Sequence, residues 1–231
     1  MPFLSPEEWT AVALSLRVSF WATLVAMPLA VWVAYILARR RFWVHGLLNG
    51  LVHLPLILPP VVTGYLLLLT FGRRAPVGAW LEQTFGLVFA FRWTGAALAA
   101  GLMGFPLMVR AVRLAIEAVD PKLEEAAATL GASRGWVFVT VTLPMILPGL
   151  ITGAILGFAK AMGEFGATIT FVSNIPGKTQ TLPSAIYAFL QVPGGESSAL
   201  RLVIVSVVIA LGAVLVSELL ARRATKLVAG K

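Results

Sequence analysis

The stretch EEAAATLGASRGWVFVTVTLP, residues Glu124–Pro144, places a short acidic and alanine-rich segment next to long apolar runs. Asp120 and Pro121, just before it, form a favoured helix start, with a capping carboxylate followed by a proline at the first helical position. Gly131 is a favoured helix stop because glycine adopts the left-handed conformation readily. The sequence therefore predicts a helix over about 121–131, which is about 15 Å long.

Two features of this predicted helix bear on its role. Glu124 and Glu125 lie near the positive end of the helix dipole. One face carries only small or medium apolar side chains at helical spacing, namely Leu123, Ala126, Ala127 and Leu130. Such a shallow face cannot insert deeply into lipid, but it fits a groove on another protein. An ordinary helical loop without a partner is the alternative.

The composition of the chain indicates a membrane protein. Its 231 residues are 59% hydrophobic and only 12% charged, and a soluble domain carries about twice that charge. The mean hydropathy is +0.91, and apolar runs of roughly 20 residues recur along the chain. The alternating ten-residue strands of a barrel are not seen, so the predicted fold class is all-α integral membrane.

The sequence contains no cysteine, which excludes disulfides, zinc–thiolate sites and cysteine nucleophiles. The N-terminal sequence MPFLSPEEW has no basic region and does not look like a cleaved signal peptide. We therefore expect the first apolar run to anchor the protein. The pattern predicts one transmembrane domain over 1–231 with five helices, at about 11–38, 44–71, 88–112, 137–163 and 200–221. A sixth helix within 164–197 is the second choice.

The basic residues predict the orientation of these spans. With the N-terminus outside, eleven of them lie inside: Arg39, Arg40, Arg41, Arg110, Arg113, Lys122, Arg134, Arg222, Arg223, Lys226 and Lys231. Six lie outside: Arg73, Arg74, Arg92, Lys160, Lys178 and Arg201. Because cytoplasmic loops collect Lys and Arg, the N-terminus is predicted to be external and the C-terminus cytoplasmic. The same rule explains the net charge of +8 without a nucleic-acid partner.

The opening stretch also matches a family pattern. Glu125-Ala126-Ala127 is followed by three residues and Gly131, then by nine residues, Val141, one residue and Leu143-Pro144. This spacing resembles the EAA loop of ABC-importer permeases, with Val141 in place of isoleucine. The resemblance implies a type I ABC-importer permease fold and a coupling helix that docks into a groove of an ATPase subunit. The implied coupling residues are Glu124, Glu125, Ala126, Ala127, Leu130, Gly131, Val141, Leu143 and Pro144.

Four further segments resemble molybdate-transporter permeases: HLPLILPPVVTGYLLL (53–68), GFPLMVRAVRLAIEAVD (104–120), GEFGATITFVSNIPG (163–177) and VPGGES (192–197). The resemblance implies molybdate import across the cell inner membrane, driven by ATP hydrolysis on a separate subunit. It also implies an external molybdate-binding protein that meets the outer loop, roughly 173–197. Tungstate and sulfate are close alternatives, since all three are tetrahedral dianions.

The predicted assembly contains two copies of this chain and two ATPases. Five helices scarcely enclose a cavity for a hydrated dianion, and one EAA loop serves only one ATPase, so a homodimer is expected. ATP and magnesium are expected on the partner ATPase, and no cofactor or metal is expected on this chain. Gly177-Lys178-Thr179 is not a phosphate-binding loop, because Val172 stands where the pattern needs a glycine.

The fourth predicted span and its outer end hold the candidates for the pathway or the interface between copies: Gly149, Gly153, Gly157, Glu164, Thr168, Thr170, Ser173 and Asn174. The glycines recur every four residues, which favours close helix packing, and lining a narrow pathway is the alternative. This face and the segment 168–174 are expected to approach the dimer axis. Glu164 is predicted to hold Lys160 or to cap the following backbone. The hydroxyls and the amide suit brief contact with an oxyanion.

Two other classes of function are less compatible with the sequence. An intramembrane enzyme needs a catalytic constellation within the spans, but His45 and His53 have no carboxylate partner nearby in sequence, and no Ser-His or paired-Asp arrangement is seen. A channel needs no ATPase, and the EAA pattern disfavours it. A transport subunit without catalytic residues of its own is therefore the favoured interpretation.

Overall fold

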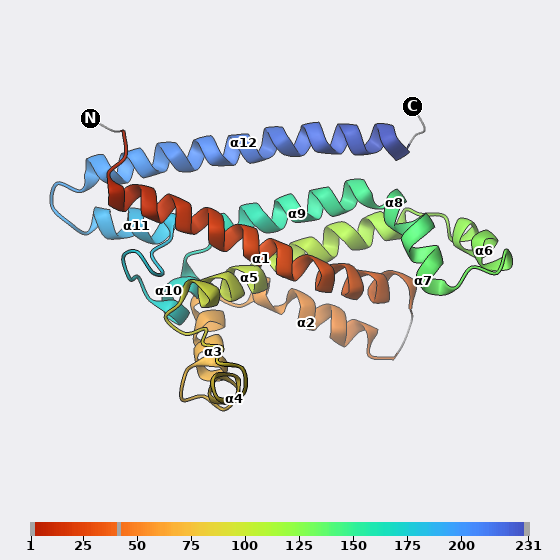
Figure 1. Ribbon diagram of the computed structural model, residues 1–231, viewed down its shortest axis with the longest axis horizontal. Helices are drawn as coiled ribbons and strands as arrows, with labels where there is room; N and C mark the ends of the chain where they lie inside the picture. The colour runs from red at the N-terminus through yellow and green to blue at the C-terminus, as the bar shows by residue number, and fades with distance from the viewer. Residues whose placement is uncertain (1–2, 41–42, 229–231) are drawn as a thin grey trace.

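The computed structural model describes residues 3–40 and 43–228, and every regular element within them is a helix. Arg41 and Lys231, two of the basic residues counted for orientation, lie outside the described residues. The bundle is built from α1 (Pro6–Arg39), α5 (Trp93–Glu117), α9 (Leu147–Met162) and α12 (Glu196–Val228) (Figure 1). The shorter elements are α2 (His45–Ile57), α3 (Pro60–Phe71), α4 (Pro76–Phe85), α6 (Pro121–Thr129), α7 (Arg134–Val137), the π-helix η1 (Phe138–Thr142), α8 (Leu143–Met145), α10 (Gly166–Val172) and α11 (Leu182–Leu190).

The bundle has two distinct ends (Figure 1). At one end, which we call the α6 end, α1 finishes beside α6 and α7. At the other, the α11 end, α1 and α12 both begin next to α11. The prediction of an all-helical membrane fold is confirmed, because three helices are long and apolar enough to cross a membrane, or five if each of two bent pairs counts as one span.

The second predicted span, 44–71, is not one helix. Helices α2 and α3 meet at 111°, and the break falls at Leu58 and Pro59, which are both extended with ψ of 143° and 133°. Proline lacks an N–H and disfavours the helical conformation in the residue before it, so consecutive prolines stop α2. The sequence located the prolines but predicted a continuous span. In the structure α3 turns sideways out of the bundle together with α4 (Figure 1).

The fourth predicted span, 137–163, is also broken. The segment Arg134–Met145 lies at 73° to Leu147–Met162, with the bend at Ile146 between two prolines. Only α9 continues through the bundle, and its 16 residues are about 24 Å long. The correction has the same cause as in the second span, because Pro144 and Pro148 both remove backbone donors near the bend.

The region 164–197 does not form a sixth span. It contains α10 with seven residues and α11 with nine, whereas crossing the apolar layer takes roughly 20. Helix α11 begins after Thr181, which occupies its N-cap position. The Thr181 side chain makes no capping hydrogen bond there. Helices α4 and α10 were not predicted.

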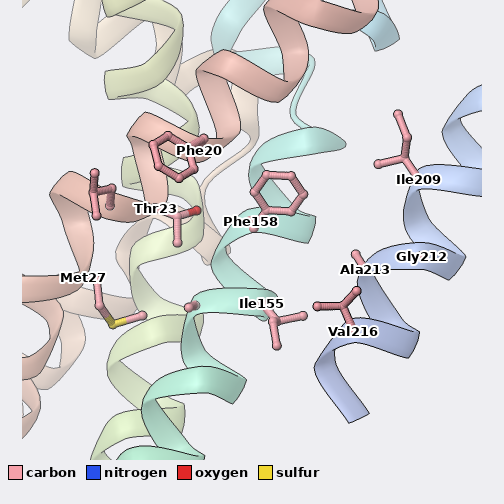
Figure 2. Close-up of a pocket in the computed structure, with 11 residues that line it drawn as sticks. Phe20, Thr23, Met27, Ile155, Phe158, Ile209, Gly212, Ala213 and Val216 are labelled. Carbon is pink, nitrogen blue, oxygen red and sulfur yellow. The ribbon is translucent and has the colours of Figure 1, made fainter. Parts of the chain in front are cut away.

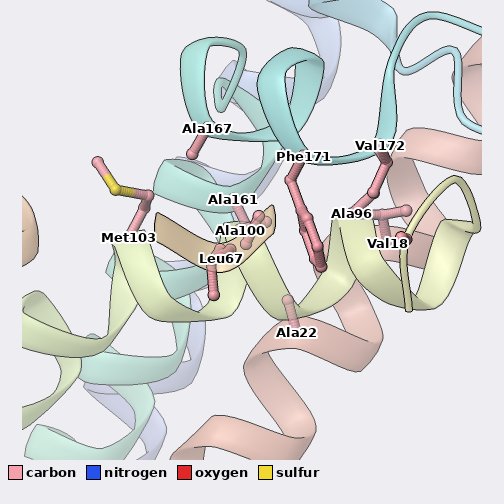
Figure 3. Close-up of a cluster of buried hydrophobic side chains, with 12 residues drawn as sticks. Val18, Ala22, Leu67, Ala96, Ala100, Met103, Ala161, Ala167, Phe171 and Val172 are labelled. Carbon is pink, nitrogen blue, oxygen red and sulfur yellow. The ribbon is translucent and has the colours of Figure 1, made fainter. Parts of the chain in front are cut away.

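Helix α5 is the centre of the bundle. In its most apolar window 67% of residues are buried, against 28% for α1 and 11% for α12. Around it, side chains from five helices form one cluster, which includes Ala22 of α1, Leu67 of α3, Ala100 of α5, Ala161 of α9 and Phe171 of α10 (Figure 3). Most of these residues are small, and small side chains let helices approach closely where lipid offers no hydrophobic driving force.

Helix α12 is attached mainly through its first turns, where Ala199 and Leu202 are buried. Farther along, an apolar groove of about 510 Å³ lies between α1, α9 and α12. Figure 2 shows Ile155 and Phe158 of α9 on one side of it and Ile209 of α12 on the other. The outer side of α12 is apolar and exposed, as expected for a helix that faces lipid or another chain.

Candidate functional site

Helix α6 forms where the sequence predicts it. Asp120 accepts a hydrogen bond from the backbone N–H of Lys122 at 3.0 Å, and Pro121 occupies the first turn. The helix ends at Thr129, and Gly131 follows with a φ of +88°, a conformation that favours glycine. The capping residue, the proline and the glycine therefore all perform the local roles that their positions predict.

The outer side of α6 is open. None of its residues is buried, Leu123 is 46% exposed and the adjoining Leu130 is 89% exposed. Trp136 on α7, which contacts α6, is 63% exposed. An apolar surface made of Leu123, Ala126, Leu130 and Trp136 is thus available to a partner. Trp136 is not among the residues predicted from the sequence, although a tryptophan five residues after the stop glycine is a signal for it.

The two glutamates of α6 point in different directions. Glu125 is exposed. Glu124 faces the bundle, where its carboxylate lies 3.2 Å from Nε of Arg39 at the end of α1. Nη2 of Arg39 donates a hydrogen bond to Glu124 at 3.3 Å and to the carbonyl of Val119 at 3.0 Å. Thr142 of η1 donates a second hydrogen bond to Glu124 at 2.7 Å. Glu124 therefore holds α6 against the bundle, whereas Glu125 remains at the surface.

Val141, Leu143 and Pro144 surround the bend that follows. Val141 lies in η1 and Leu143 and Pro144 in α8. Because proline has no N–H and its ring clashes with the carbonyl four residues earlier, a regular helical ladder cannot continue through Pro144. Leu143 donates to the carbonyl of Phe138 with the wider π spacing. Leu143 packs against the core cluster of α1 and α5. The pattern residues thus shape the joint between α6 and α9.

Helix α5 of the same chain fills the glycine face of α9. A Cβ on Gly149 would lie 2.2 Å from Cβ of Ala115, and one on Gly157 would lie 2.7 Å from the side chain of Met108. Gly153 faces Met108 and Val112 at 3.4 Å. The predicted packing against a neighbouring helix is therefore found within the chain. The expectation that this face approaches a second copy stays a prediction.

Glu164 is almost fully buried and makes two local contacts. Its carboxylate lies 3.2 Å from Nζ of Lys160 and accepts a hydrogen bond from the backbone N–H of Ala167 at 2.9 Å. These are the two contacts that the sequence analysis named as alternatives, and both are present. Glu164 therefore fixes the turn between α9 and α10, as expected for a buried carboxylate that has partners.

The hydroxyls proposed for an oxyanion are partly engaged elsewhere. Thr168 donates to the carbonyl of Phe165 at 2.9 Å, and Thr170 donates to the carbonyl of Gly166 at 2.8 Å. An oxyanion needs donors, so neither hydroxyl is ready to bind one. Ser173 is exposed at the end of α10, with an unusual φ of +65° for a residue other than glycine. The assignment of Ser173 and Asn174 to the oxyanion stays a prediction.

The described residues contain no group of three or more His, Asp or Glu side chains arranged to hold a metal ion. The charged groups form pairs in place of clusters. At the α11 end, Arg201 of α12 lies 2.6 Å from the carboxylate of Glu8 on α1. At the α6 end, Arg39 pairs with Glu124. Each end of α1 is therefore tied to another element by an ion pair.

The sequence is similar to those of known transport permeases along most of its length. The chain is 58% identical over 219 residues to the molybdenum transport system permease protein ModB of Escherichia coli K12, covering 95% of this chain and 96% of that one. It is 52% identical to the ModB protein of Haemophilus influenzae, with the same coverage. It is 36% identical to the sulfate transport system permease protein CysT of E. coli K12, covering 81% of this chain and 67% of that one.

Among solved structures, the fold resembles a bacterial alginate ABC transporter in complex with an alginate pentasaccharide-bound periplasmic protein. The TM-score is 0.76 at 20% sequence identity, and the match covers 97% of this chain and 81% of that one. The family model described as "binding-protein-dependent transport system inner membrane component" matches residues 26–226. Those residues make up most of the chain and include the bent second span, α6 and the joint before α9. The chain therefore belongs to the family of inner membrane components of binding-protein-dependent transport systems.

Proposed function

We propose that this chain is the permease subunit of an ABC importer that moves molybdate into the cytoplasm. The observation that carries the proposal is the 58% identity to a molybdenum transport permease along nearly the whole of both chains. Sulfate transport is the second candidate, supported by the 36% identity to a sulfate permease. Tungstate has the same shape and charge as molybdate, and it is expected to share the pathway.

The proposed partner at the α6 end is an ATP-binding subunit. The apolar surface of Leu123, Ala126, Leu130 and Trp136 is exposed and shallow, which suits a groove on another protein. ATP and magnesium are assigned to that subunit. A single chain carries one such surface, so we infer two copies of the chain and two ATP-binding subunits in the assembly.

The proposed orientation puts the N-terminus outside and the C-terminus in the cytoplasm. The pair between Glu8 and Arg201 sets the starts of α1 and α12 at the α11 end. The pair between Arg39 and Glu124 sets the end of α1 beside α6. If α6 meets a cytoplasmic ATPase, the starts of α1 and α12 must be external. The count of basic residues supports the same orientation.

The α11 end is the proposed docking side for an external binding protein. The segment 173–197 lies there, with Lys178, Gln191 and Glu196 exposed. Polar, exposed loops on a rigid scaffold are common sites of partner binding. The solved alginate transporter, which shares only the fold, was captured with a periplasmic protein. We infer that the binding protein delivers molybdate at this end.

Transport by the complete complex tests the proposal. The chain, its ATP-binding subunit and its binding protein are placed in vesicles, and accumulation of labelled molybdate is measured with and without ATP. We expect accumulation that requires ATP and that excess tungstate inhibits more strongly than excess sulfate does. Equal or stronger inhibition by sulfate would favour the second candidate. ATP-independent flux would indicate a channel and contradict the proposal.

Cysteine labelling tests the orientation separately, because the natural chain has no cysteine. In cells that lack the ATP-binding subunit, a single cysteine replaces either Lys178 or Leu130, both of which are exposed. With a reagent that does not cross membranes, we expect labelling at position 178 in intact cells, and at position 130 only after the cells are opened. The reverse pattern would overturn the orientation.

A further inference from the structure

Helix α6 has little packing to hold it. None of its residues is buried, and its nine residues are too few to form a stable helix alone in water. If a partner pushes or pulls on α6, something other than a hydrophobic core must carry that movement into the bundle. The polar contacts of Glu124 are the connections that the structure offers.

These contacts link α6 to three predicted spans. Arg39, the last residue of α1, reaches both carboxylate oxygens of Glu124, at 3.2 and 3.3 Å. Thr142, in the first half of the bent fourth span, donates to the same carboxylate at 2.7 Å. Arg39 also donates to the carbonyl of Val119, just after α5. Glu124 and Arg39 therefore join α6 to α1, to α5 and to the fourth span.

The pair is sheltered but not deeply buried. The Arg39 and Glu124 side chains are 15% and 17% exposed, and Thr142 is buried. Hydrogen bonds that involve charged groups are stronger than neutral ones, and water competes less in a sheltered site. The Glu124 carboxylate accepts hydrogen bonds from α1 and from η1 at the same time. A movement of α6 therefore displaces both donors, Arg39 and Thr142, together.

We propose that Arg39, Glu124 and Thr142 form a clamp that transmits movement of α6 to α1 and to the fourth span. Arg39 acts as a positioning residue through Glu124 and need not touch the ATP-binding subunit or the substrate. This inference rests on the proposed function, since it takes α6 as the ATPase contact. It assigns Glu124 to the inside of the protein and leaves Glu125 for the partner surface.

The clamp predicts a specific defect. In Arg39→Gln every side chain of α6 is unchanged, so the ATP-binding subunit still docks and still hydrolyses ATP. The hydrolysis no longer moves the spans efficiently. We expect the ratio of molybdate transported to ATP hydrolysed to fall by roughly tenfold, the factor expected when a charge-assisted hydrogen bond is lost from one of two coupled states.

The experiment measures uptake and ATP hydrolysis in the same vesicles, together with co-purification of the ATP-binding subunit. The matched control is Arg73→Gln, which removes a similar arginine–glutamate pair, with Glu82, far from α6 in the chain. Exchange of the charges, Arg39→Glu combined with Glu124→Arg, is expected to restore the ratio at least in part. A merely structural role would lower both activities together and leave their ratio unchanged.

The outcomes separate this inference from the proposed function. If the wild-type complex transports molybdate and Arg39→Gln keeps the wild-type ratio, the clamp is wrong and the proposed function stands. If Arg39→Gln loses co-purification of the ATP-binding subunit, the pair supports docking and the clamp is also wrong. If the wild-type complex itself shows no ATP-dependent uptake, the proposed function has failed before the clamp is tested.

Discussion

Small residues line two regions of this protein, and the surroundings of the two regions are opposite. Along α9, a Cβ on Gly149 would lie 2.2 Å from Cβ of Ala115 on α5. Around α6, Ala126 is exposed, and a Cβ on Gly131 would meet nothing within 4 Å. Small side chains permit close approach in both places. In the α9 seam the approaching helix is already present, whereas at α6 the surface is open.

This difference explains how each region is held in place. The seam between α5 and α9 is stabilised by close contact along several turns, with Gly104 and Gly157 near one another. Helix α6 is stabilised by its caps and by Glu124. Substitutions that enlarge small residues should therefore damage folding in the seam and function at α6.

The largest effect is expected from Gly149→Val. Its added atoms collide with the Ala115 side chain, which cannot rotate away, so α9 must shift from α5. Overpacking of this kind costs about 1–3 kcal/mol and sometimes more. We expect a lower yield of folded protein and a lower midpoint of thermal unfolding in detergent.

A paired change sharpens the same test. Combining Gly149→Ala with Ala115→Gly moves one methyl group across the seam, and should recover much of the stability lost by Gly149→Ala alone. Gly135→Ala is the control, since a Cβ there meets nothing within 4 Å. Equal loss from Gly135→Ala and Gly149→Ala would show that the seam is not tightly packed.

At α6, Ala126→Trp should abolish most transport without affecting folding. Ala126 is exposed, so the indole meets no atoms of this chain's core, but it blocks a close fit with a partner. We expect an unchanged unfolding midpoint, with loss of both co-purified ATP-binding subunit and molybdate uptake. Normal uptake in this variant would reduce α6 to an ordinary loop and remove the contrast with the seam.

Gly131→Val should have an intermediate effect. The space around Gly131 is open, so the cost comes only from its φ of +88°, which is about 1–3 kcal/mol for a residue other than glycine. Because asparagine tolerates this conformation better, Gly131→Asn should keep more uptake than Gly131→Val does. If the two variants behave alike, the backbone conformation is not what the position requires.

The smallest effect is expected at the arm formed by α3 and α4. The hydrogen bond from Arg73 holds the pKa of Glu82 below its ordinary value. Because the pKa of Glu82 is lowered in the folded state, its pair with Arg73 stabilises the folded state at pH values above the pKa that Glu82 has in the unfolded chain. This contribution is lost as the pH falls through the pKa of Glu82 in the folded state.

Arg73→Gln should therefore differ slightly from the wild type in unfolding midpoint at pH 7, and the difference should vanish under acidic conditions. Arg73 is exposed and Glu82 is half-buried at the surface, where an ion pair contributes little, so we expect unchanged uptake. A strong loss of uptake would mean that this arm contributes to transport, as the clamp at α6 is proposed to do.

Local signals in the sequence predicted local structure well. The cap at Asp120, the stop at Gly131 and the contacts of Glu164 with Lys160 and Ala167 involve residues within a few positions of each other. Contacts across the chain were not predicted in the same way. Glu124 was assigned to a partner surface, because nothing near it in sequence indicates that Arg39, 85 residues away, is its partner.

The broken spans show the same limit in another form. Prolines 55, 59, 60, 144 and 148 lie in the two broken spans. A proline that only kinks a span and a proline at which a helix leaves the bundle give the same sequence signal. The angles of 111° and 73° are set by what the second half packs against. For α3 that is α10, where a Cβ on Gly64 would lie 2.5 Å from the carbonyl of Ala167.

The sequence by itself determined the membrane class, the approximate positions of the three long helices α1, α5 and α12, the short helix 121–131 and the family resemblance. These depend on hydropathy, on caps and on fixed spacing, all of which act within a few turns of the chain. Only the tertiary structure decided that α5 covers the glycines of α9, that α3 leaves the bundle and that Glu124 faces inward. Such choices depend on which distant segments meet, because a small or charged side chain is compatible with several neighbours until packing selects one.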